Sequence, residues 1–158
     1  MIKLNRTTEY GLMALRYMSR QGSERVSARE IADLYGLPFE ITAKTLQRLK
    51  DSGLIQSAQG AHGGYTLGRP LTETTLAEFI QVMEGPQYLV SCADPEAAVS
   101  SSKAKKSSGG CEYSGKCEIR SVLGDLNARF HTFLAGIRLA ELVGETPVQP
   151  IARVSHGA

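Results

Sequence analysis

Long apolar runs are missing from this sequence. No uninterrupted apolar stretch approaches the roughly 20 residues that a membrane-spanning helix needs. The opening residues, MIKLNRTTEYG, also lack the apolar core of a secretory signal. These absences argue against a membrane protein, and we expect a cytoplasmic one.

Motifs for catalysis are missing as well. The chain contains no glycine-rich phosphate-binding motif and no combination of serine, histidine and aspartate typical of hydrolases. Of its three histidines, His62 lies in a glycine-rich stretch and His156 lies near the end of the sequence. We therefore expect a binding protein and not an enzyme.

Cysteine is scarce, and its number is odd. The three cysteines all lie in the second half of the chain. Because a reducing cytosol disfavours structural disulfides, such thiols are idle, redox-active or metal ligands. The choice among these three roles decides the mechanism.

Basic residues are concentrated in the first half, although the net charge is only +2. Residues 1–70 carry ten Lys and Arg against six Asp and Glu, whereas residues 71–158 carry eight against ten. This asymmetry indicates a basic face for a polyanion in the N-terminal half. A chain of 158 residues with 42% apolar content is long enough to bury one compact core.

The first half has the local signals of three helices. Apolar residues recur at helical spacing over residues 7–19. Ser27 and Glu30 form a capping box that opens a second, short helix, and Gly36 ends it. A third helix is predicted from Pro38 to about residue 52, because proline fits the first helical turn. Its predicted inward stripe is Ile41, Thr45, Leu46 and Leu49.

The outward face of this third helix is polar, as in the recognition helix of a helix-turn-helix. Glu40 accepts from cytosine, Lys44 donates to guanine and Gln47 pairs with adenine in the usual base contacts. Ala43 suits a thymine methyl, and Arg48 suits a phosphate. A solvated polar face is the alternative interpretation of the same pattern.

A glycine-rich hairpin follows directly and favours the DNA-binding interpretation. Residues 54–56 and 65–67 read as two short strands around the loop QGAHGG. Within this wing, Gln59 and His62 are in reach of the minor groove or the DNA backbone, although His62 also fits an ordinary loop residue. The sequence thus predicts a mainly α fold with a small β-hairpin wing, a winged helix-turn-helix DNA-binding domain over residues 1–86.

The second half is expected to contain a loop, a long helix and a tail. Residues 87–117 hold the cysteines and a mobile insert rich in Ser, Ala, Lys and Gly. A helix over residues 118–145 precedes a flexible tail over 146–158. The helix favours packing on the same helix of a second subunit, and intramolecular packing stays open. Its apolar stripe is Ile119, Val122, Leu123, Leu126, Phe130, Phe133, Leu134 and Ile137.

These motifs together resemble the Rrf-type winged-helix transcription regulators that are similar to IscR and NsrR. The resemblance lies in LNRTTEYGLMAL, in REIADLYGLPFEITAKTLQRLKDSGLI, in the wing QGAHGGYTLGRP and in GKCEIRSVLGDL. It implies a homodimer, usually a repressor, that binds a palindromic operator in double-stranded DNA. It also implies an iron–sulfur cluster, 2Fe-2S or 4Fe-4S, which senses nitric oxide, redox state or iron supply and alters DNA affinity.

The resemblance places Cys92, Cys111 and Cys117 at cluster-ligand positions, and thiolates are the usual ligands of such clusters. Two features differ from IscR-like members: Cys92 and Cys111 are farther apart, and Arg120 stands where those members have a ligand histidine. In NsrR-like members a carboxylate from the partner's first helix is the fourth ligand, and Glu9 matches its position to within one residue. The alternatives are a surface role for Glu9 and a cluster-free thiol regulator in which Cys111 and Cys117 form a reversible disulfide.

Overall fold

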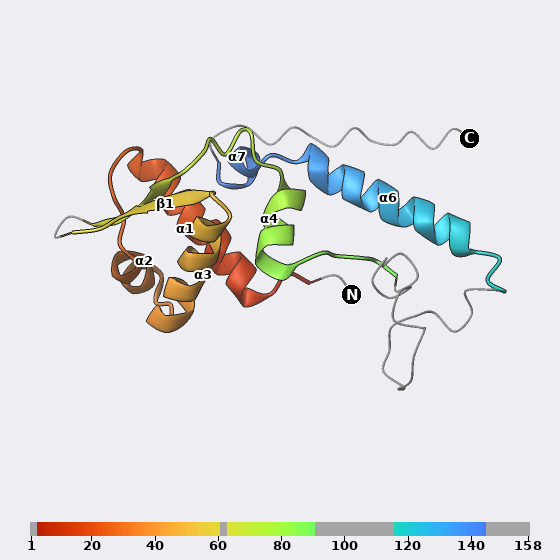
Figure 1. The fold of residues 1–158 in the computed structure, drawn as a ribbon, viewed down its shortest axis with the longest axis horizontal. Helices are drawn as coiled ribbons and strands as arrows, with labels where there is room; N and C mark the ends of the chain where they lie inside the picture. Colours follow the sequence, from red (N-terminus) through yellow and green to blue (C-terminus); the bar gives the residue numbers. More distant parts are fainter. Residues whose placement is uncertain (1–2, 61–62, 91–115, 145–158) are drawn as a thin grey trace.

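Helices and one β-hairpin build the fold, which is known from a computed structural model that describes residues 3–60, 63–90 and 116–144 (Figure 1). The helices are α1 (Arg6–Gln21), α2 (Ala28–Tyr35), α3 (Phe39–Asp51), α4 (Leu76–Glu84), α6 (Arg120–Gly136) and α7 (Leu139–Leu142). The strands are β1 (Ile55–Ala58) and β2 (Gly64–Leu67). This architecture confirms the predicted winged-helix fold class. Most of the predicted cysteine loop and the whole predicted tail lie outside the described residues.

Local capping explains where the helices start. At α2 the backbone N–H of Glu30 donates to Ser27 Oγ at 3.0 Å, and the Ser27 N–H donates back to the Glu30 carboxylate at 3.4 Å. The same reciprocal pair opens α4, where Glu78 N donates to Thr75 Oγ1 at 3.1 Å and Thr75 N to Glu78 Oε2 at 2.8 Å. Both capping boxes satisfy N–H groups that a helix start leaves free. Gly36 ends α2 in the left-handed conformation, at φ +63°.

The two strands pair antiparallel to form the wing. Ile55 lies opposite Leu67, and Ala58 lies opposite Gly64. The chain just before α2 adds a further bridge, because Val26 and Tyr65 exchange two backbone hydrogen bonds of 2.9 and 2.8 Å. The wing is therefore held to the helix-turn-helix along one edge of β2.

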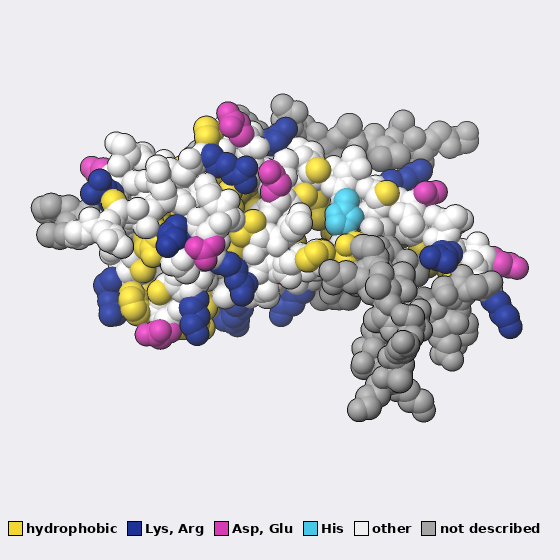
Figure 2. Space-filling view, viewed as in Figure 1, with side chains coloured by type: hydrophobic (Ala, Val, Ile, Leu, Met, Phe, Trp, Pro, Cys, Tyr) yellow, Lys and Arg dark blue, Asp and Glu magenta, His cyan; other side chains and the backbone are white. Residues whose placement is uncertain are grey.

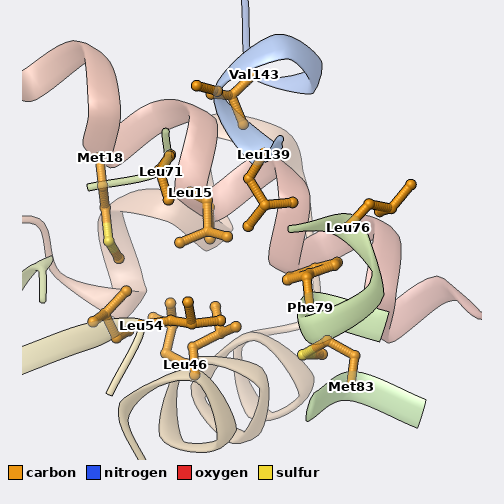
Figure 3. Packing of buried hydrophobic residues seen from close by; sticks show 14 of the residues in the cluster. Leu15, Met18, Leu46, Leu54, Leu71, Leu76, Phe79, Met83, Leu139 and Val143 are labelled. Atoms are coloured by element: carbon orange, nitrogen blue, oxygen red, sulfur yellow. The ribbon is translucent and has the colours of Figure 1, made fainter. Parts of the chain in front are cut away.

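The hydrophobic core lies between α1, α3, α4 and the C-terminal α7 (Figure 3). Leu15, Leu46 and Phe79 are fully buried, and so is Leu139 from the far end of the chain. Ala140 and Val143 belong to the same cluster. The winged-helix core is thus completed by residues far beyond the predicted boundary at residue 86.

The predicted helix over residues 118–145 is wrong in its C-terminal part. Helix α6 ends at Gly136, and Ile137 is extended, at φ −91° and ψ 125°. The Ile137 carbonyl accepts from Leu76 N at 2.8 Å, and Leu139 N donates to the Thr74 carbonyl at 2.9 Å. These backbone bonds to the start of α4, together with the burial of Leu139, outweigh continuation of the helix.

One inward position of α3 was also predicted wrongly. Ile41 is 40% exposed, whereas Thr42 is only 2% exposed and takes its place in the core. The Thr42 hydroxyl donates to the Pro38 carbonyl at 3.0 Å, so this polar group is satisfied when buried. Pro38 itself precedes α3 as its N-cap instead of forming the first turn.

Candidate nucleic-acid interface and cysteine site

Helix α3 presents a polar face to solvent beside the wing. Glu40, Lys44, Gln47 and Arg48 are exposed, while Ala43 is half-buried at the edge of the face. The structure thus brings these five predicted residues together on one helix. Figure 2 shows lysine and arginine side chains gathered over the end of the molecule that carries α2 and α3.

Two of these side chains already have partners. The Gln47 amide nitrogen donates to Asp51 Oδ1 at 2.6 Å, one turn along the helix. Arg48 Nη1 donates to the Met83 carbonyl in the last turn of α4 at 2.7 Å. Arg48 therefore links α3 to α4, a contact that no sequence signal indicated.

A hollow lies along one side of this face, between α3, the start of α1 and the end of α4. Its volume is about 290 Å³, and it is lined by Thr7, Ile41, Lys44, Thr45, Arg48 and Met83. The sequence did not predict that Ile41 and Thr7 border this face of α3. The periodicity of α3 placed Ile41 inward, and only the packing of α1 and α4 shows that it faces the hollow.

The wing residues are described only in part. Gln59 is exposed next to Gly60, where the chain turns at φ +113°. His62 lies outside the described residues. The predicted role of the wing in DNA binding stays a prediction for both residues.

The predicted cysteine site is also described only in part. Cys117 is half-buried with a free thiol, and its carbonyl accepts from Arg120 N at 3.4 Å where α6 begins. Cys92 and Cys111 lie outside the described residues, whereas Glu9 is exposed in the first turn of α1. Within the described part of the chain, no three His, Cys, Asp or Glu side chains lie close enough together to hold a metal ion.

Helix α6 extends away from the body of the molecule and packs on α4 near its C-terminal end (Figure 1). The predicted apolar stripe divides into two faces. Leu134 is buried and Leu123 and Phe130 are half-buried, whereas four side chains at helical spacing are exposed. These four form what we name the α6 stripe: Ile119, Val122, Leu126 and Phe133, with exposed fractions of 58, 62, 51 and 47%.

The helix pair α2 and α3, with a capping box at α2 and an exposed polar face on α3, and the hairpin wing define a winged helix-turn-helix protein. The Rrf2 family profile, described as "Iron-dependent Transcriptional regulator", matches residues 4–145. The chain belongs to this family, and it is a transcriptional regulator and not an enzyme, as the sequence predicted. None of the helices within the described ranges is both long and apolar enough to cross a membrane.

Individual relatives agree with this assignment. The chain is 25% identical over 152 residues to the HTH-type transcriptional repressor NsrR of Streptomyces coelicolor, which covers 95% of this chain and 93% of the relative. It is 28% identical over 127 residues to the regulator IscR of Photorhabdus laumondii, covering 80% and 70%. The solved structure of CymR, the global cysteine regulator of B. subtilis, shares the fold with a TM-score of 0.65 and 22% identity, covering 92% of this chain and 99% of CymR.

Proposed function

We propose that the protein is a dimeric repressor that binds a palindromic operator with α3 in the major groove. The observation that carries this proposal is the exposed face of α3 beside the wing. Glu40, Lys44 and Gln47 point donors and acceptors away from the body, where base edges are read. Arg48, with Gln59 and His62 of the wing, contacts the sugar–phosphate backbone or the minor groove. The protein acts in the cytoplasm, where bacterial DNA lies.

The α6 stripe supports the dimer. Four large apolar side chains are exposed along one line of a helix that leaves the body of the molecule. Pairing with the same stripe of a second copy removes this surface from water and is typical of helix–helix association. A two-fold dimer places two α3 helices on one duplex, which matches a palindromic site.

An iron–sulfur cluster is the sensor that we propose. Cys92, Cys111 and Cys117 supply thiolates, and Glu9 of the partner subunit supplies a carboxylate; this donor set suits iron. The bound cluster would supply a group that reacts with nitric oxide or oxidants or reports the iron supply. The family description as iron-dependent regulators supports this assignment. Cys117 would hold the cluster next to the start of α6, the helix that we propose to form the dimer.

A thiol-based regulator is the second candidate. Cys111 and Cys117 are close in sequence, within the glycine-containing segment GGCEYSGKCE, which suits a reversible disulfide. In this case oxidation of the two thiols replaces cluster chemistry as the signal. The fold and the DNA-binding surface are the same in both candidates.

Anaerobic purification separates the two candidates. We expect wild-type protein to be coloured and to contain iron, and Cys117→Ala to lose the iron while it stays folded. Colourless, iron-free wild type that still binds DNA would contradict the cluster. Mass spectrometry after mild oxidation tests the alternative, which predicts a Cys111–Cys117 crosslink.

Binding to promoter fragments at several salt concentrations tests the DNA partner. Replacing Lys44 and Arg48 with alanine lowers affinity for all sequences as well as for the operator and reduces the salt dependence, because both cationic side chains displace counterions from the DNA. Replacing the exposed Gln81 of α4 with alanine is the control. Affinity that does not change with salt would contradict the proposed DNA contact.

A further inference from the structure

The segment that leaves α4, residues 85–90, runs towards α6, and we name it the strap (Figure 1). The backbone N–H of Leu89 in the strap donates to Asn127 Oδ1 of α6 at 2.9 Å. Asn127 is only 9% exposed, so the bond is partly shielded from water. One helical turn further, the His131 ring lies 6.2 Å from the ring of Tyr88 in the strap. Two neighbouring side chains on one face of α6 thus hold the strap.

The last turn of α4, at the other end of the strap, is tied to both α1 and α3. The Met83 carbonyl accepts from Arg48 of the recognition helix at 2.7 Å. Glu84 Oε1 accepts from Asn5 N at 2.9 Å and from the hydroxyl of the fully buried Thr8 at 2.5 Å. Residues 83 and 84 therefore fix the end of α4 to the start of α1 and to α3.

Helices α6 and α3 are thus connected through the Asn127–Leu89 bond, the backbone of the strap and the Met83–Arg48 bond. Chains of hydrogen bonds and packed side chains are the kind of network through which energetic coupling between two sites travels. We propose that Asn127 is a positioning residue that couples the position of α6, through the strap, to the recognition helix. The coupling itself does not depend on the proposed function, but its role in DNA binding rests on that function. Cys92 follows Leu89 by three residues in the sequence.

Hydrogen exchange of the full-length protein without DNA tests the coupling. Asn127→Leu removes the acceptor for Leu89 N, and Asn127→Asp keeps an acceptor oxygen at the same place. We expect Asn127→Leu to speed exchange about fivefold in residues 85–90 and also in residues 46–51 of α3, the effect of one lost hydrogen bond on a local opening equilibrium. Asn127→Asp should speed exchange less than Asn127→Leu, because it keeps the acceptor for Leu89 N.

A matched control lies on the same helix. The Thr132 hydroxyl donates to the Ala128 carbonyl of α6 itself at 2.9 Å, so Thr132→Ala loses a bond without touching the strap. We expect no change in α3 for this variant. Faster exchange confined to the strap and α6 in Asn127→Leu would overturn the proposal, because it would show a local structural role alone.

A second variant removes the same bond from the other side. Leu89→Pro has no backbone N–H and leaves the sequence of α6 unchanged, so it tests the coupling even where Asn127→Leu does not fold. Faster exchange in α3 supports the coupling, and unchanged exchange in α3 overturns it.

DNA binding then shows what the coupling does. With a fragment selected for binding by wild type, we expect Asn127→Leu to change the affinity about fivefold and Asn127→Asp to change it less. Unchanged affinity for Asn127→Leu would overturn the role in DNA binding. Wild-type protein that selects no DNA sequence would contradict the proposed function, while the exchange experiment still decides whether α6 and α3 are coupled.

Discussion

Replacing Gln47 of α3 tests whether this side chain contacts a base edge or a phosphate. Its amide is exposed and bonded to Asp51 across one turn, which holds the side chain in a fixed direction. We expect Gln47→Ala to weaken the sequence preference at one base pair. The binding free energy for sites with the preferred base falls by about 1–3 kcal/mol, and that for sites with other bases changes little. Selection from a library of randomised sites, compared with Gln81→Ala, measures this. An equal loss of affinity for all sequences would instead show that Gln47 contacts the DNA sugar–phosphate backbone.

Glu78 gives the stability of the fold a pH dependence. The pKa of its carboxyl is lowered from the ordinary value of 4.5, chiefly because the Thr75 backbone N–H donates to it. A carboxylate with a lowered folded pKa stabilises the protein above pH 4.5, and this contribution is lost as the pH falls through the lower, folded pKa. We expect Glu78→Ala to cost about 1 kcal/mol at pH 7, since the group is partly exposed, and less in acid.

The control for Glu78 is its own amide. Glu78→Gln keeps an acceptor for the Thr75 N–H but does not titrate. Urea unfolding across pH 3–7 should therefore show a smaller loss at neutral pH for the glutamine variant than for the alanine variant. A difference between wild type and Glu78→Ala that does not change with pH would show that the carboxylate charge contributes nothing.

Helix α7 contributes to the hydrophobic core, which the sequence did not predict. Leu139 is fully buried among α1 and α4, although it is separated from them by the cysteine segment and α6. We expect Leu139→Ala to lower the free energy of unfolding by about 2–5 kcal/mol, because it leaves a cavity in a packed core. Leu142→Ala, at an exposed position on the same helix, should cost far less. Equal effects in thermal unfolding would contradict the packing.

Elements that local chemistry defines were predictable from sequence, and elements that packing defines were not. Ser27 with Glu30 and Thr75 with Glu78 fixed the starts of α2 and α4 through their own hydrogen bonds. The end of α6 at Gly136 depends on pairing with the start of α4, which lies far away in sequence. A periodic apolar pattern carries no information about such a partner.

The candidate site divides in the same way. The polar face of α3 follows from helical periodicity, so Glu40, Lys44 and Gln47 were found from sequence. Ile41 was not, because its exposure depends on how Thr7 and Met83 border the hollow. The cysteine ligands came from the resemblance alone, since three thiols without known spatial neighbours specify neither a cluster nor a disulfide.

At the scale of the whole molecule, one protomer leaves two functions incomplete. In the proposed function, a single α3 reads half of a palindromic site, and Glu9 on α1 is predicted to serve the partner's cysteines. The α6 stripe is the surface that we propose to join two copies, since α6 extends from the body with four large apolar side chains exposed. In the function that we propose, both DNA affinity and sensing depend on dimer formation.

Leu126→Glu tests this dependence, because it places a charge in the middle of the α6 stripe. The side chain is 51% exposed in one protomer, so the substitution leaves the winged-helix core intact. We expect a monomer by light scattering, a thermal midpoint that no longer depends on protein concentration, and an operator affinity about 100-fold lower, since the second half-site is no longer tethered. Ala128→Glu, exposed on another side of α6, should remain a dimer with wild-type affinity. A Leu126→Glu protein that stays dimeric would place the subunit interface elsewhere, and the partner's Glu9 would then have to reach the cysteines by another route.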